Sequence, residues 1–230
     1  MKTEKKEENE EKNAKREKII KEKNKKEDFE KQDLKKFDEN FEKIILGVDE
    51  AGRGPLAGPV VASAIIIKND FDEIVENNDS KKLTEKKREK LYEAITSNCI
   101  VGVGIASETE IDEINILNAT FLAMRRAIDK VKEIADFDIV LVDGNHKIRE
   151  FSGEQECVIK GDSKSLAIAA ASIVAKVTRD KMMCEIAKEF PEYNFEKHKG
   201  YGTKAHREVL LKIGPCKYHR KSFLKKIFNN

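Results

Sequence analysis

The stretch GVDEAGRGPLAGPV, from Gly47 to Val60, constrains the fold of this chain more than any other part of its sequence. The β-branched, apolar run at 44–48 predicts a buried strand that leads into it. Asp49 and Glu50 follow directly, and neighbouring side chains of a regular strand point to opposite faces. We therefore expect the strand to break into a turn here, so that both acids reach one site. A second apolar run, 60–67, predicts a strand antiparallel to the first.

The triplet Gly52-Arg53-Gly54 forms the predicted turn. Glycine has no Cβ, so this backbone can approach a ligand closely and present N–H groups to it. Arg53 is a cation that can contact the ligand itself. Carboxylates beside backbone donors and an arginine point to a hard metal ion and a phosphate together. A solvated turn would explain the acidic pair alone, but it would not need so many constrained residues.

A third acid, Asp143, ends the apolar run 139–142 and precedes Gly144. Ligands of open α/β sheets gather at the carboxyl ends of the strands. If this strand lies beside the first one, Asp143 and Asp49 project towards the same place. In isolation, an aspartate before a glycine would be explained as a turn former.

Asp162 stands at the entrance of a long predicted helix, where helix capping is its plainer role. Ser163 and Ser165 can also cap that helix, which would leave Asp162 for another task. The rival acid, Asp180, lies four residues after Lys176, the spacing of an ordinary ion pair on a helix. We therefore favour Asp162 as the fourth acid of the site.

Hydrophobic periodicity and capping residues predict the other elements. They are a helix over 85–96, a strand over 99–106, a helix with an apolar stripe at 114, 117, 121, 124 and 128, a strand over 157–160, a helix from 166 to about 189 and a helix ending at 211. Thr84, Ser107 and Thr203 are the expected N-caps, with Glu110 completing a capping box. The alanine-rich start of the 166–189 helix allows it to pack very close to a sheet.

The C-terminal segment 195–230 holds 10 basic and 2 acidic residues, whereas 41–194 holds 21 and 28. An acidic body with a basic segment suits a metal–carboxylate site that is served by a polyanion-binding surface. Tyr201 stands between two glycines and is expected to be exposed, so its ring can stack on a base or sugar. His206 is expected to face nucleic acid or solvent, and the tail at 218–223 is basic with interleaved aromatic residues.

The remaining composition bounds the class of protein. Residues 1–40 hold 14 basic and 13 acidic residues without an apolar stripe, which predicts a flexible extension, with a nucleic-acid tether as the alternative. The four cysteines are widely spaced, which argues against a zinc site and a disulfide framework. Neither a secretory signal nor a membrane span is visible, so a reduced cytoplasmic protein is expected.

Taken together, these motifs resemble the ribonuclease HII family, which cleaves RNA in RNA–DNA hybrids. The resemblance covers about residues 43–223 and rests on five segments in the family's order: 47–60, 79–83, 138–145, 161–180 and 198–223. The triplet at 52–54 separates the chain from ribonuclease HIII enzymes, which usually carry a different one. The resemblance implies that Asp143 and Asp162 bind metal, that Lys81 contacts the nucleic-acid backbone and that Tyr201 packs beside the cleavage point.

The expected site therefore joins four carboxylates, Asp49, Glu50, Asp143 and Asp162, as catalytic residues and ligands of Mg²⁺ or Mn²⁺. Two such ions would clamp a phosphodiester for hydrolysis by water. The resemblance implies 5′-phosphate and 3′-hydroxyl products, and nicking 5′ of even a single ribonucleotide in duplex DNA. The substrate-binding set comprises Gly52, Arg53, Gly54, Lys81 and Tyr201. The expected partners are RNA–DNA hybrids and ribonucleotide-containing duplexes, with no membrane, and the protein is expected to be a monomer.

From the order of the elements and this resemblance we expect an α/β fold, a ribonuclease H-like mixed five-stranded sheet flanked by helices, with a helical C-terminal part. The first three strands should be antiparallel and the last two parallel to the first. Residues 1–40 would be the extension, 41–194 the catalytic domain and 195–230 a basic substrate-binding segment packed on the same domain.

Two other functions compete with this one. A non-catalytic nucleic-acid-binding module would explain the basic tail, but not four acids placed to repel a polyanion. An enzyme that transfers phosphoryl groups on a small molecule would explain the metal ligands, but it would not need the basic tail. Salt-dependent duplex binding and the loss of turnover with retained binding separate these cases.

Overall fold

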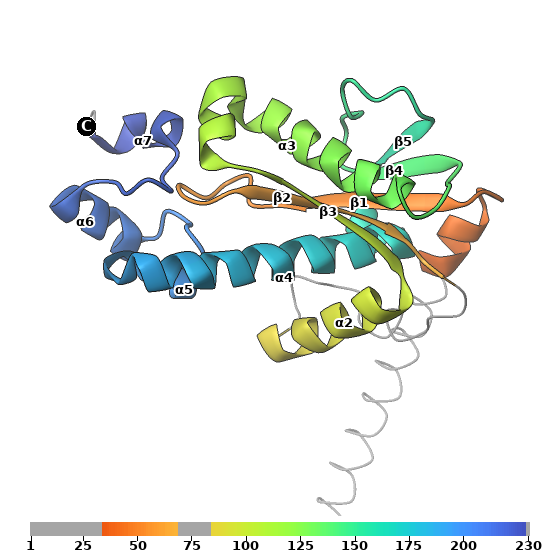
Figure 1. The fold of residues 1–230 in the computed structure, drawn as a ribbon, viewed down its shortest axis with the longest axis horizontal. Coiled ribbons are helices and arrows are strands. Elements are labelled where there is room, and N and C mark those ends of the chain that lie inside the picture. Colours follow the sequence, from red (N-terminus) through yellow and green to blue (C-terminus); the bar gives the residue numbers. More distant parts are fainter. Residues whose placement is uncertain (1–33, 69–83, 229–230) are drawn as a thin grey trace, which may run out of the picture.

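The computed structural model describes residues 34–68 and 84–228, and in them one mixed sheet forms the centre of the fold. Its strands lie in the order β3-β2-β1-β4-β5 (Figure 1). They are β1 Ile45–Ala51, β2 Val60–Ile66, β3 Ile100–Ala106, β4 Ile139–Asp143 and β5 Gln155–Val158. The pairs β1–β2 and β2–β3 are antiparallel, whereas β4 pairs with β1 and with β5 in parallel. This topology confirms the predicted α/β fold.

Helices cover both faces of the sheet and one of its ends. They are α2 Glu85–Asn98, α3 Glu108–Lys132, α4 Leu166–Glu189, α5 Phe195–His198, α6 Lys204–Ile213 and α7 Lys221–Phe228, with 3-10 turns η1 Gly161–Ser163 and η2 Pro191–Tyr193. Figure 1 shows α3 on one face of the sheet, α4 and α2 on the other, and the C-terminal helices gathered at one end. The predicted helical C-terminal part is therefore present.

Two apolar layers result from this arrangement. Leu46 and Val48 of β1 pack with α3 on one face, and Ile65 of β2 packs with α2 and α4 on the other. Every residue of β2 is buried, because helices cover both of its faces. A strand buried on both faces reads as a continuous apolar run rather than an alternating one, as the sequence shows.

The contact between β1 and α4 is unusually close. A Cβ on Gly47 would lie 2.3 Å from the main-chain carbonyl carbon of Ala167 and 2.5 Å from the main-chain nitrogen of Ile168. The alanine-rich start of α4 makes this approach possible, as predicted. β1 and α4, which flank the candidate site, thus pack with their main chains in direct contact.

The predicted N-caps are all found. Thr84, Ser107 and Thr203 accept hydrogen bonds from the first turns of α2, α3 and α6, and Glu110 completes the capping box with Ser107. Ser165 accepts a 3.2 Å bond from the main-chain N–H of Ile168 and so caps α4. Asp162 is therefore not the capping residue of this helix.

β1 ends at Ala51, directly before the predicted glycine turn, and β2 pairs with it that far. Two details differ from the predictions. β5 ends two residues earlier than predicted, since the chain turns at Lys160, whose φ is 56°. Ile114 of the predicted core stripe is 37% exposed, because the non-helical backbone of Asn115 (φ 66°) kinks α3 there.

The last residues of the expected N-terminal extension are helical, over 34–39. Leu34 is buried against α2 and α4, and Asp38 accepts a 3.0 Å hydrogen bond from the main-chain N–H of Ala167. Burial raises the pKa of Asp38 to about 6 despite these bonds. The expected boundary at residue 40 thus falls after a turn that packs on the domain. Within the described residues, no helix combines the length and the apolar character needed to cross a membrane.

Candidate active site

A cavity of about 430 Å³ opens where β1 runs past the end of β4. The parallel pairing of these strands ends at Val48 and Val142, so the next residues of β1 lack a neighbour on that side. The lining residues come from β1, the loop after it, α2, β4, α4 and the segment before α6. They are Asp49, Glu50, Ala51, Gly52, Arg53, Arg88, Asp143, Ser172, Lys176 and Tyr201.

Three of the four predicted acids meet in this cavity, namely Asp49, Glu50 and Asp143. Asp49 is only 5% exposed, and its Oδ1 accepts a 2.7 Å hydrogen bond from the main-chain N–H of Glu50. The open edge of β1 explains how two adjacent strand residues border one site. The structure thus brings Asp49 and Asp143 together, as the parallel strand order predicts.

Two carboxylates of the cavity, those of Asp49 and Glu50, resist ionisation. Burial raises the pKa of Asp49 well above its ordinary value, the charges of Glu50 and Asp143 raise it further, and a hydrogen bond with Ser172 lowers it. Burial also raises the pKa of Glu50, although the salt bridge to Arg53, 3.3 Å long, opposes that rise. A bound cation would favour the ionised forms of both acids.

The fourth predicted acid, Asp162, lies on the η1 turn beside Asp143. The main-chain N–H of Gly161 donates a 2.6 Å hydrogen bond to Oδ1 of Asp143, so η1 is fastened directly to the acid at the end of β4. Asp162 is half-buried there and is not among the residues that line the cavity. Its part in the site stays a prediction.

The donor set fits a hard divalent cation. Within residues 34–68 and 84–228, no group of three carboxylate, histidine or cysteine side chains has the geometry of a metal-binding site. The cavity nevertheless offers carboxylate oxygens as its negatively charged ligand atoms, and burial raises the pKa values of Asp49 and Glu50, which a bound cation would offset. Oxygen ligands of this kind suit Mg²⁺ or Mn²⁺ rather than zinc.

The predicted recognition residues border the mouth of the same cavity. The Arg53 side chain is half-exposed, and the Tyr201 ring is 44% exposed. A Cβ on Gly54 would lie 3.8 Å from Cε1 of Tyr201, so the glycine loop and the tyrosine stand face to face. Gly52 has a φ of 98°, which favours glycine. Lys81 lies outside the described residues.

Sequence reasoning missed Arg88, Ser172 and Lys176. The last two lie four residues apart on α4, so they share one helix face, and this spacing was a usable signal. No sequence pattern predicted that Arg88 lines the cavity, because its position there depends on how α2 packs. Lys176 also forms the ion pair expected with Asp180, at 2.7 Å. Asp180 itself lines a neighbouring cavity of about 230 Å³.

His206 was expected to face nucleic acid or solvent, and this is wrong. The side chain is fully buried, with its Nε2 3.0 Å from Nε2 of His219 and its Nδ1 2.9 Å from the carbonyl oxygen of Tyr201. The expected basic tail is therefore partly internal. The histidine pair ties the segment before α7 to the segment that carries Tyr201.

We expect this pair to make stability pH-dependent. Burial lowers the pKa of His206 and of His219 from 6.5 to about 4, so the unfolded chain binds more protons between these values. Stability should therefore fall as the pH decreases from 6.5 towards 4. In urea unfolding, the free energy of unfolding of His206→Gln should fall over this pH range by about 3 kcal/mol less than that of the wild type.

The exposed His146 supplies the matched control, because His146→Gln should keep the wild-type pH dependence. Acids with raised pKa values, such as Asp38, change stability with pH in the opposite direction. Their effect is the same in the wild type and in both variants. If His206→Gln keeps the pH dependence of the wild type, the buried His206 is not a cause of that dependence.

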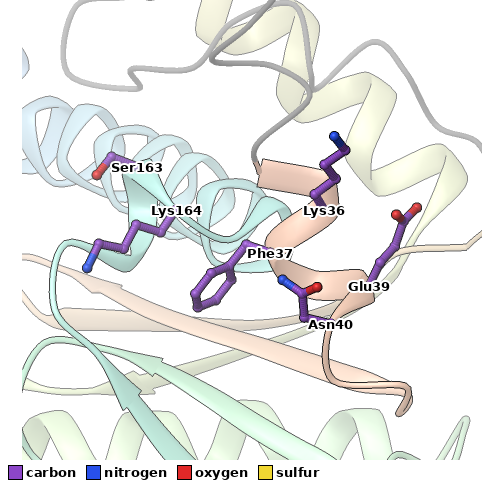
Figure 2. Close-up of a pocket in the computed structure, with 6 residues that line it drawn as sticks. All are labelled: Lys36, Phe37, Glu39, Asn40, Ser163 and Lys164. Atoms are coloured by element: carbon purple, nitrogen blue, oxygen red, sulfur yellow. The ribbon is translucent and has the colours of Figure 1, made fainter.

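A second cavity, of about 590 Å³, lies between the helical turn 34–39 and the residues that follow Asp162. Figure 2 shows Phe37 projecting towards the side that holds Ser163 and Lys164, whereas Lys36 and Glu39 point away from it. The lining contains one acid, Glu39, and no aromatic ring beside Phe37. This cavity does not repeat the donor set of the first one.

Comparison with known sequences identifies the family of this chain. The sequence model of the family described as Ribonuclease HII matches residues 46–230. A ribonuclease HII of Fusobacterium nucleatum subsp. nucleatum is 60% identical over 188 residues, which cover 80% of this chain and 87% of that protein. The match thus includes both the carboxylates and the C-terminal segment.

Solved structures agree on the fold. A ribonuclease HII of Archaeoglobus fulgidus, solved in complex with PCNA, superposes with a TM-score of 0.66 at 27% identity, covering 77% of this chain and 94% of that one. Ribonuclease H2 of Pyrococcus horikoshii OT3 gives a TM-score of 0.65 at 25% identity, covering 80% and 97%.

Proposed function

The chain belongs to the ribonuclease HII family and is an endoribonuclease of the ribonuclease H class, and from this we propose its substrates and chemistry. The enzyme hydrolyses the RNA strand of RNA–DNA hybrids and nicks duplex DNA on the 5′ side of embedded ribonucleotides. The products carry 5′-phosphate and 3′-hydroxyl ends. One observation supports this most directly: three carboxylates share a cavity whose mouth is bordered by a glycine-arginine-glycine loop and an exposed tyrosine.

In this proposal Asp49, Glu50, Asp143 and Asp162 hold Mg²⁺ or Mn²⁺. Two such ions supply activation of water and stabilisation of the leaving oxygen. The protein's part is to keep the acids at the open end of β1 and β4 and to shield them from bulk water. The salt bridge between Arg53 and Glu50 joins this centre to the recognition loop.

Substrate selection depends on the 2′-hydroxyl, the group that distinguishes RNA from DNA. Gly52 and Gly54 let the loop backbone come close enough to read it, while the half-exposed Arg53 contacts the adjacent phosphate or sugar. Tyr201, across the opening, stacks on the neighbouring nucleotide. Lys81 is proposed to contact the nucleic-acid backbone, as the family resemblance implies.

Charge supports the same assignment of regions. The segment 195–230, with 10 basic and 2 acidic residues, supplies attraction for a polyanion that the acidic region 41–194 would repel. The proposal places the enzyme in the cytoplasm, acting as a monomer in ribonucleotide removal during DNA replication and repair. Residues 1–40 are proposed to be a charged extension, of which 1–33 lie outside the described residues.

Cleavage of labelled duplexes tests the proposed function. Three substrates are compared with Mg²⁺, with Mn²⁺ and with a chelator: a DNA duplex with one ribonucleotide, a long RNA–DNA hybrid and an all-DNA duplex. We expect metal-dependent nicks 5′ of the single ribonucleotide, cleavage of the hybrid and no cleavage of the all-DNA duplex. Cleavage of the hybrid alone would overturn single-ribonucleotide recognition, and salt-sensitive binding without any cleavage would favour a binding module.

A further inference from the structure

Two buried guanidinium groups stand behind the glycine-arginine-glycine loop. Arg179 of α4 is 1% exposed, and Arg220, directly before α7, is fully buried. No carboxylate of the described residues forms an ion pair with either side chain. A buried charge without a counterion is destabilising unless other polar groups compensate for it. The hydrogen-bond partners of these two arginines therefore show which part of the protein their charges stabilise.

Both side chains donate only to main-chain carbonyl groups. Arg220 bonds to the carbonyl oxygens of residues in and after the loop, and Arg179 to those of two residues after the loop and of one residue in the segment that carries Tyr201. The distances from Arg220 are 2.6 Å to Gly52, 3.0 Å to Arg53, 2.8 Å to Pro55 and 2.9 Å to Gly58. Those from Arg179 are 3.1 Å to Ala57, 3.0 Å to Pro59 and 3.0 Å to Lys199.

These bonds fix the direction of the loop's peptide groups. No cis peptide bond occurs in the described residues, and in a trans peptide the C=O and the following N–H point to opposite sides. Because the carbonyls of Gly52 and Arg53 face Arg220, the N–H groups of Arg53 and Gly54 face away from it. Neither N–H has a hydrogen-bond partner in the part of the chain that the structure describes. Gly52 and Arg53 line the cavity, so these donors lie at its mouth.

Arg179 also supports the opposite wall of the opening. The guanidinium of Arg179 lies 5.9 Å from the centre of the Tyr201 ring. A Cβ on Gly52 would lie 2.1 Å from Nε of Arg179, so the loop rests directly on this side chain. The main chain of Arg220 also donates a 2.9 Å bond to Leu56. Arg179 thus contacts both the loop and the tyrosine, while Arg220 holds the loop.

Arg220 keeps its charge at neutral pH. Burial, together with the nearby charge of Arg179, lowers its pKa to about 9, which is still above neutrality. A cation at this place also makes the loop's outward-facing N–H groups better donors, since its hydrogen bonds polarise the peptide groups.

We propose that Arg220, assisted by Arg179, is a positioning residue for ribonucleotide selection. By holding the carbonyls of the loop inward, it aims the N–H groups of Arg53 and Gly54 at the substrate. The inference rests on the proposed function, because it names a residue that controls ribonucleotide selection at the proposed active site. The competing explanation is that Arg220 only stabilises the packing of the C-terminal helices.

Binding separates the two explanations. Affinities for a duplex with one ribonucleotide and for the matched all-DNA duplex are measured without divalent metal, for the wild type, Arg220→Lys and Leu224→Ala. Leu224 is buried in the same C-terminal cluster, and its apolar side chain has no hydrogen-bonding atom for the loop, so its truncation reports destabilisation alone. An ammonium group cannot satisfy four carbonyls at once. We expect Arg220→Lys to lose about tenfold in ribonucleotide preference, the effect of one misplaced hydrogen bond, and Leu224→Ala to keep the wild-type preference.

Chemical rescue gives a second readout. Arg220→Ala leaves a space shaped for a guanidinium, so millimolar guanidinium chloride should restore the ribonucleotide preference of this variant, whereas the same concentration of sodium chloride should not. Circular dichroism and thermal unfolding show which variants fold. Equal losses of preference in Arg220→Lys and Leu224→Ala, or failure of Arg220→Lys to fold, would overturn the inference in favour of a structural role. A wild type that neither prefers nor cleaves ribonucleotide substrates would instead overturn the proposed function itself.

Discussion

The Asp143→Asn variant is expected to cleave about 1,000-fold more slowly than the wild type, a difference on the order of 4 kcal/mol in activation free energy. Asparagine keeps the shape of the side chain and the bond from the Gly161 N–H, which needs only an acceptor oxygen. It removes the negative charge that a divalent cation requires. The measurement is the single-turnover rate on a duplex with one ribonucleotide, at saturating Mg²⁺ and at saturating Mn²⁺.

Binding of that duplex should survive the substitution. Asp143 carries the same sign of charge as the substrate, so its neutralisation removes repulsion and does not weaken the basic surface. Metal-free affinity should therefore be equal to that of the wild type or tighter. Retained binding with lost turnover also separates a nuclease from a simple binding module.

Asp180→Asn is the matched control for this experiment. Asp180 is another partly buried acid of the same region, but it is paired with Lys176 and lines the neighbouring cavity. We expect its loss to change the cleavage rate less than tenfold, the range of a weak ion pair. A similar 1,000-fold loss in both variants would contradict the choice of Asp162 over Asp180, and an active Asp143→Asn would contradict the site.

The Gly47→Ala variant should show the largest loss of stability, about 3 kcal/mol or more. The added methyl would meet the main chain of Ala167 at 2.3 Å, and neither element has a flexible side chain there that could move aside. A chain of this size should then unfold about 10 °C lower. Thermal and urea unfolding, monitored by circular dichroism, measure both quantities.

Gly54→Ala is the control, because a Cβ there meets only Tyr201, at an ordinary 3.8 Å, and the residue has no positive φ. Its stability should lie within about 0.5 kcal/mol of the wild type. If Gly47→Ala unfolds at the wild-type temperature, the close approach of α4 to β1 is wrong. The cleavage site would then lack the rigid support ascribed to it.

The strands, the capping residues and the meeting of Asp49 with Asp143 were predictable because their causes are local or follow from strand order. Ser107 and Glu110 specify a helix start on their own, and an aspartate at a parallel strand's end must lie at one edge of the sheet. The turn at Gly52-Arg53-Gly54 was predictable for the same reason, because these glycines directly follow β1, which ends at Ala51. The early end of β4 supplies an open edge that no local pattern reveals.

The C-terminal tail could not be interpreted correctly from composition. Arg220 and His219 were counted as part of a basic surface, because a charged residue is normally solvated. The burial of Arg220 depends on carbonyls that lie more than 160 positions away along the chain, and that of His219 depends on a histidine of α6. Arg88 is a similar case, since only the packing of α2 brings it to the cavity.

The bond between Arg220 and Gly52 joins residues 168 positions apart, which has a consequence for the order in which the enzyme matures. A growing chain displays the acids of β1 long before the arginine that shapes the neighbouring loop has been made. Contacts between distant segments also form late in folding, since closing a long loop costs entropy first. Fraying of the segment before α7 would release the loop while the central sheet stays intact. Selectivity should therefore be the last property that this enzyme gains and the first that it loses.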